Sequence, residues 1–175
     1  MAVDIERWPR PRPVLYRRRT RCGVRPPAIV PAMNPTDFTE RLVIRLPHTD
    51  AAGVVFYPKV FEIEQELFER WLELGGFSLR DMLDRRLAPT PIVHCEADYR
   101  LPVRAGDKLV AQLAGVEIGR SGYTLAWTFS LGGEAAISAR VKRVAIDPRA
   151  GESIDLPEAF RQWLLETQSR AGGLP

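Results

Sequence analysis

Residues 46–73 read LPHTDAAGVVFYPKVFEIEQELFERWLE, and the second half of this stretch has a clear helical pattern. Apolar side chains recur there at the spacing of one helix face, at Val60, Ile63, Leu67, Trp71 and Leu74. Proline favours the first helical position and glycine the position after the last one, which fits Pro58 and the pair Gly75–Gly76. The sequence therefore predicts one long helix with a single apolar face. Four acidic residues lie mostly off that face: Glu62, Glu66, Glu69 and Glu73.

Segments with strand character surround this helix. FTERLVIRL (38–46) precedes it, and four longer segments follow at 90–103, 107–119, 123–132 and 134–148, with turn residues between them. Two shorter helices are expected at 78–87 and 156–167. The plan is one strand, one long helix and four strands in meander-like succession. This order indicates an α+β fold in which an antiparallel sheet wraps around one central helix.

The chain of 175 residues is long enough for one domain with a real core. Residues 1–32 hold eight arginines against two acids, a balance of +6, which leaves 17 basic and 20 acidic residues elsewhere, a balance of −3. The basic character thus belongs to the proline-rich N-terminal part and is poor support for a nucleic-acid-binding fold. We predict a disordered extension at 1–35, or a true start at Met33, then a domain at 36–168 and a flexible tail at 169–175.

The few cysteines and histidines restrict the chemistry. Cys22 and Cys95 suggest neither a disulfide framework nor a metal site, and they fit a reducing compartment such as the cytoplasm. With His48 and His94 as the only histidines, a zinc site is not expected. No apolar run reaches the roughly 18 residues that a membrane-spanning helix needs, and no glycine-rich nucleotide-binding motif is present.

Asp50 is the residue most suggestive of chemistry. It lies between two apolar segments, where a carboxylate is costly to desolvate. It also precedes a helix start, whose unpaired N–H groups can stabilise developing negative charge. Gly53 allows a turn or a close approach to a ligand. A buried carboxylate beside such donors suits acyl transfer or hydrolysis; the alternative is an aspartate that only supports a turn.

Three segments, in order, resemble the hotdog-fold acyl-CoA thioesterases of the 4-hydroxybenzoyl-CoA thioesterase type. They are HTDAAGVVFYPKVFE, TPIVHCEADYRLPVRAGDKL and RVAIDP followed by SIDLPEAFRQWL, and the resemblance covers roughly residues 38–166. It implies a hotdog fold and a thioester hydrolase without a cofactor, since coenzyme A (CoA) is part of the substrate. It also implies a homo-oligomer, commonly a tetramer, with sites between two subunits.

The resemblance also implies roles for particular residues. Asp50 stands at the position of the family's catalytic carboxylate, which attacks the thioester carbonyl or activates a water molecule. Tyr57 stands where a backbone N–H polarises that carbonyl, and Gly53 and Val54 line the approach. Another hotdog group carries its base as a glutamate on the long helix, which makes three residues rivals. We interpret these three instead as a solvated or interfacial flank of the helix: Glu62, Glu64 and Glu66.

Substrate contacts are expected from several further residues. His48 either tunes Asp50, contacts the acyl group or is solvated. His94, Thr90 and Pro91 belong to the strand that borders the acyl pocket in the family. The phosphates of CoA need basic partners, for which the turn residues Arg120 and Ser121 are candidates.

Within this family, the amino-acid sequences of the same segments resemble those of the 1,4-dihydroxy-2-naphthoyl-CoA hydrolases of cyanobacteria, which act in phylloquinone or menaquinone synthesis. The alternatives are a 4-hydroxybenzoyl-CoA thioesterase, a short-chain acyl-CoA thioesterase, or a non-catalytic acyl-CoA-binding hotdog module. In each case the partner is a small acyl-CoA molecule, with no nucleic acid or membrane.

Overall fold

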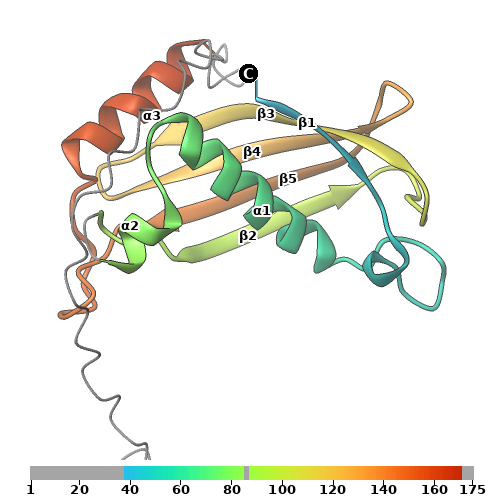
Figure 1. Ribbon diagram of the computed structural model, residues 1–175, viewed down its shortest axis with the longest axis horizontal. Coiled ribbons are helices and arrows are strands. Elements are labelled where there is room, and N and C mark those ends of the chain that lie inside the picture. Colours follow the sequence, from blue (N-terminus) through green and yellow to red (C-terminus); the bar gives the residue numbers. More distant parts are fainter. Residues whose placement is uncertain (1–37, 85–86, 171–175) are drawn as a thin grey trace, which may run out of the picture. The chain divides into compact units, whose positions relative to one another are not determined.

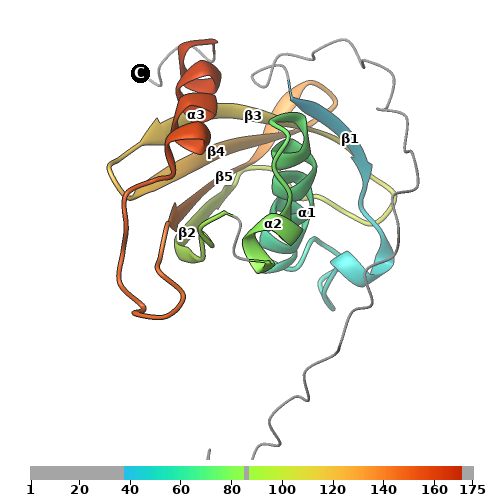
Figure 2. The same ribbon diagram turned by 60° about the vertical axis from the view of Figure 1, so that its left-hand side comes forward.

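The computed structural model describes residues 38–84 and 87–170. In chain order the elements are β1 (Thr39–Val43), the 3-10 turn η3 (Leu46–His48), α1 (Lys59–Leu74), α2 (Leu79–Leu83), β2 (Ile92–Tyr99), β3 (Lys108–Ile118), β4 (Gly122–Leu131), β5 (Glu134–Val144) and α3 (Glu158–Arg170). The sheet curves around α1 (Figures 1 and 2), so the predicted antiparallel sheet around one long helix is confirmed. The predicted extension at 1–35 lies outside the described residues, as do residues 171–175 of the predicted tail.

The five strands lie in the order β1-β3-β4-β5-β2, and every neighbouring pair is antiparallel. The predicted meander is therefore correct for β3, β4 and β5 but wrong for β2, which pairs with β5 at one edge. Residues 100–107 carry the chain from β2 to the other edge of the sheet, where the Ile44 N–H donates to the Asp107 carbonyl at 2.9 Å. This crossing places β3 beside β1.

Helix α1 packs its apolar side into the concave face of the sheet. Its buried residues are Val60, Glu64, Leu67, Phe68, Trp71 and Leu72. The helix begins at Lys59, with Pro58 as its N-cap rather than its first residue, and Gly75 follows its end as predicted. Two residues of the predicted apolar face differ, since Ile63 is half-buried and Leu74 is 40% exposed. The buried side extends instead toward α3, whose Trp163 ring lies 4.1 Å from that of Trp71 between centroids.

The two edges of the sheet are unequal. β1 has only five residues, whereas β2 has eight, all of them exposed apart from half-buried Ala97. Exposed strand edges offer unpaired N–H and C=O groups to another chain. Among the described residues, no helix has the length and apolar character needed to cross a membrane.

Candidate active site

Asp50 begins a tight turn between η3 and α1. Its side-chain Oδ1 accepts a hydrogen bond from the Ala52 N–H at 2.8 Å, and its backbone bonds to Val54 and Gly53, each at 3.0 Å. Gly53 has a φ of 75°, a conformation that glycine adopts without strain. Asp50 is exposed in the single protomer, so the predicted burial of its carboxylate is wrong for the isolated chain. The turn holds one carboxylate oxygen and leaves the other one accessible.

The N–H of Tyr57 is the first unpaired donor after this turn. The two N–H groups between the turn and Tyr57 are bonded, Val55 to the Val103 carbonyl at 2.7 Å and Phe56 to the His48 carbonyl at 2.8 Å. For Tyr57 no acceptor is found among the described residues. The Tyr99 hydroxyl donates to the Tyr57 carbonyl at 2.7 Å and so fixes this segment of backbone. An oriented, unpaired N–H at a helix start is suited to an oxyanion.

Tyr99 was not predicted, because nothing in the sequence of β2 distinguishes its hydroxyl from that of any strand tyrosine. Burial raises the pKa of Tyr99, with a smaller contribution from Cys95, so the hydroxyl keeps its proton and remains a donor. The Tyr57 side chain itself is 64% exposed and packs edge-on against Phe56. A role for Tyr57 thus depends on its main chain.

His48 bonds to the backbone next to η3 and not to Asp50. Its Nδ1 accepts a hydrogen bond from the Arg45 N–H at 3.1 Å. The ring lines a separate cleft of about 440 Å³ between β1 and α1, together with Arg41 and Arg70. No hydrogen bond or ion pair joins His48 to the candidate carboxylate among the described residues.

A second, mostly apolar cleft of about 410 Å³ lies between α1, α2 and the start of β2. It contains Thr90 and Pro91, two of the predicted pocket residues. The remaining lining comprises Gln65, Phe68, Leu79, Met82, Leu83, Pro89, Ile92, Arg143 and Ile146. Thr90 is buried, with its Oγ1 at 3.0 Å from the Tyr123 hydroxyl.

His94, the third predicted pocket residue, does not reach this cleft. It pairs across the sheet with Lys142, and paired residues share one face of the sheet. Lys142 alternates with the buried inward residues Val141 and Arg143, so this face is the one turned away from α1. The His94 Nε2 lies 3.5 Å from Glu96.

A buried ion pair borders the apolar cleft. The Arg143 Nη2 donates to Glu64 Oε2 at 2.8 Å and to Gln65 Oε1 at 3.1 Å. The Trp127 Nε1–H donates to the other Glu64 oxygen at 3.2 Å, and the guanidinium lies 3.8 Å from the Phe68 ring centroid. Burial raises the pKa of Glu64, and the charge of Arg143 opposes that shift. Both side chains are almost fully buried, at 0% and 4% exposure.

This pair corrects the interpretation of the helix acids as a solvated flank. Glu62 and Glu66 are exposed as expected, but Glu64 is buried. The position of Glu64 on the apolar side of α1 was the sequence feature that could have indicated its burial. The partner, Arg143, was not predicted, because it lies 79 residues further along the chain.

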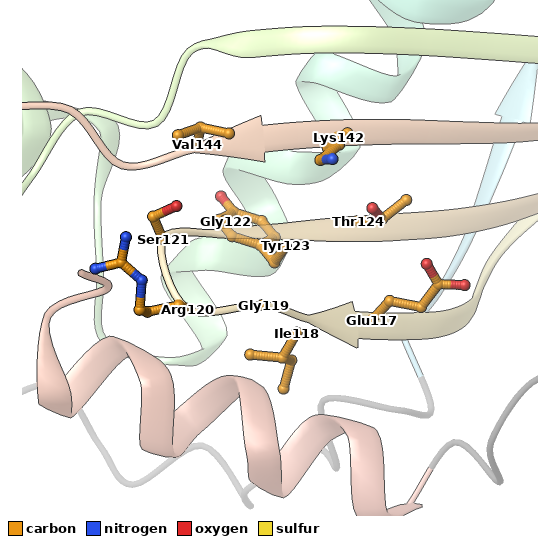
Figure 3. A pocket seen from close by; sticks show the side chains of 10 residues that line it. All are labelled: Glu117, Ile118, Gly119, Arg120, Ser121, Gly122, Tyr123, Thr124, Lys142 and Val144. Carbon is orange, nitrogen blue, oxygen red and sulfur yellow. The ribbon is translucent and has the colours of Figure 1, made fainter. Parts of the chain in front are cut away.

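A third cleft, of about 390 Å³, lies at the turn between β3 and β4. Figure 3 shows Arg120 and Ser121 at this turn and Lys142 on the adjacent strand β5. Arg120 forms an exposed ion pair with Asp155 at 2.5 Å. Lys142, which was not predicted, has no ion-pair partner among the described residues. The cleft is thus lined by two cations, Arg120 and Lys142, and by the carboxylate of Glu117.

The antiparallel sheet around one long helix, together with a match to a known family, defines a hotdog thioesterase. Residues 44–164 match the model of the thioesterase-like superfamily, and the chain belongs to that superfamily. The chain is a thioester hydrolase of the hotdog type, as the sequence predicted.

Several of the similar proteins are named for one activity. The chain is 32% identical to a 1,4-dihydroxy-2-naphthoyl-CoA hydrolase of Nostoc punctiforme over 76% of its length and 89% of the relative. It is 33% identical to the protein of that name from Prochlorococcus marinus strain NATL2A, over 72% and 86% of the two chains. The fold is similar to a 1,4-dihydroxy-2-naphthoyl-CoA thioesterase from Synechocystis, with a TM-score of 0.68, 23% identity and coverage of 73% and 95%.

Proposed function

We propose that this chain hydrolyses 1,4-dihydroxy-2-naphthoyl-CoA to the free acid and CoA, as a step of phylloquinone or menaquinone biosynthesis in the cytoplasm. The substrate is that named for its relatives. The observation that carries the chemistry is the accessible Asp50 carboxylate, held by its turn a few residues before the unpaired Tyr57 N–H.

These two groups divide the reaction between them. The Tyr57 N–H donates to the thioester carbonyl oxygen and stabilises its charge in the transition state. Asp50 either attacks the carbonyl carbon, with hydrolysis of the anhydride to follow, or removes a proton from an attacking water. The C–S bond breaks and CoA leaves as the protonated thiol. Water is the only co-reactant, so the proposed reaction uses no cofactor.

A second copy of the chain completes the proposed site. β2 begins at the apolar cleft with Ile92 and ends with Tyr99, which bonds to Tyr57. Antiparallel pairing of two β2 edges sets the start of one strand against the end of the other. The loop with Asp50 of the partner subunit then lies beside the apolar cleft, which would receive the acyl group. Two such dimers would form the tetramer implied by the family resemblance.

Cys95, near the middle of β2, tests this dimer. Cys95→Lys places like charges close together across the proposed strand pair, which destabilises it. We expect light scattering to find an oligomer for the wild type and mainly monomer for Cys95→Lys, with activity reduced about tenfold or more in parallel. The matched control is Thr39→Lys on the opposite edge strand β1. This variant should keep the wild-type oligomeric state and activity. A fully active wild-type monomer would contradict the dimer.

The turn between β3 and β4 is proposed to receive the phosphates of CoA. Arg120, Ser121 and Lys142 surround its cleft, and guanidinium and ammonium groups are common phosphate partners. Because Arg120 is already paired with Asp155, Lys142 would contribute the more available charge.

A panel of acyl-CoA thioesters tests the function. Release of CoA from naphthoyl, 4-hydroxybenzoyl and butyryl thioesters is followed with a thiol-reactive dye. A blank with enzyme alone is needed, because the chain has two cysteines, Cys22 and Cys95, whose thiols can react with the dye. We expect the highest kcat/KM for 1,4-dihydroxy-2-naphthoyl-CoA. A preference for 4-hydroxybenzoyl or butyryl thioesters would support the corresponding alternative, and binding without release would indicate a non-catalytic module.

A further inference from the structure

The apolar cleft has one charged residue, Arg143, in its lining. The Nε–H of this guanidinium is buried and has no acceptor among the described residues, whereas Nη2 bonds to Glu64 and Gln65. A buried donor without a partner is unfavourable. Arg143 thus borders the cleft and carries a donor for which the described residues supply no acceptor.

The surroundings of Arg143 hold this donor in place. Glu64 compensates the charge from one side, and the Phe68 ring lies against the guanidinium plane at 3.8 Å from its centroid. Stacking and a carboxylate partner restrict a guanidinium to one orientation. The group is therefore a rigid donor at the border of an apolar space, which is a common design for orienting a mostly apolar ligand.

We propose that Arg143 determines specificity by donating a hydrogen bond to an oxygen on the ring of an aromatic acyl group. This inference rests on the proposed function. In 1,4-dihydroxy-2-naphthoyl-CoA the 1-hydroxyl is adjacent to the thioester and can bond to its carbonyl. The 4-hydroxyl is on the far side of the ring and is the oxygen assigned to Arg143. The ring oxygen that accepts this hydrogen bond does not need a negative charge, because Glu64 already balances the charge of Arg143.

Two substrates that differ only in this oxygen test the inference: 1,4-dihydroxy- and 1-hydroxy-2-naphthoyl-CoA. A site built around a substrate hydroxyl discriminates against the analogue that lacks it. We expect the wild type to prefer the dihydroxy thioester about tenfold or more in kcat/KM. The variant Glu64→Gln/Arg143→Met removes the donor and keeps an amide oxygen for Trp127. Its preference should fall to about twofold or less, through loss of activity on the dihydroxy substrate only.

Arg140→Met is the matched control. Arg140 is a neighbouring cation on β5 that pairs with Glu96 and Glu117 on the sheet face turned away from the cleft. This variant should keep the wild-type preference. Unchanged preference in the double variant, or none in the wild type, overturns the role of Arg143 while the proposed function stands. If the wild type hydrolyses neither naphthoyl thioester, the proposed function fails and this inference with it.

Discussion

Asp50→Asn should reduce kcat on the preferred acyl-CoA by about 100-fold or more, the range expected when a general base is lost. An amide is a poor nucleophile and a poor base under these conditions, so either role of Asp50 would be lost. The fold should be unaffected, because the side chain is exposed and the asparagine Oδ1 can still accept the hydrogen bond from the Ala52 N–H. Turnover under saturating substrate and the thermal unfolding midpoint are the two measurements.

The acids of α1 provide the controls. Glu62 and Glu66 are exposed carboxylates on the first half of α1. If the base is Asp50, Glu62→Gln and Glu66→Gln should each retain activity within about threefold, since surface changes of this kind are usually mild. Retention of activity by Asp50→Asn together with its loss in either glutamine variant would move the base onto the helix.

Local patterns in the sequence were sufficient for much of this site. The apolar period and the terminal glycines located α1, and the small residues after Asp50 located the turn, because both features depend on neighbouring residues. The order of the strands in the sheet was harder to predict from the sequence. The pairing of β2 with β5 joins segments about 45 residues apart, and no local pattern specifies which edge a strand occupies.

The same limitation applies to the side chains of the site. Glu64 and Arg143 read separately as surface residues of a helix and a strand, since charged residues are rarely buried without a partner. Only the fold brings them to 2.8 Å. Tyr99 and Tyr57 are likewise joined by the fold across 42 residues. The sequence therefore located the loop better than it located the side chains that pack against it.

The buried pair carries the largest expected effect on stability. Removing one partner of a buried ion pair leaves an uncompensated charge, which costs about 3–5 kcal/mol. Arg143→Met should lower the free energy of unfolding at pH 7 by about that amount. In Glu64→Gln/Arg143→Met neither charge of the pair remains, and the Trp127 N–H keeps an acceptor. The double variant should therefore recover most of the loss, to within about 1 kcal/mol of wild type.

The loss in Arg143→Met should also depend on pH. In the wild type, burial raises the pKa of Glu64 and Arg143 opposes that shift, so removing Arg143 raises this pKa further. Below the pKa of the unfolded chain, near 4.3, the carboxyl is neutral in both states and the charge penalty is absent. As pH rises toward the folded-state pKa, the unfolded chain loses its proton first and stability falls. The deficit relative to wild type should thus be smaller at pH 5 than at pH 7.

Urea unfolding at both pH values, at one fixed protein concentration, measures these differences. The concentration must be held constant because any oligomer adds to the apparent stability. The double variant separates the buried charge from simple loss of packing, since both variants carry the same methionine. If Arg143→Met and the double variant were equally unstable at pH 7, the loss would come from packing against Phe68 rather than from the charge of Glu64. A deficit that did not change between pH 5 and pH 7 would lead to the same conclusion.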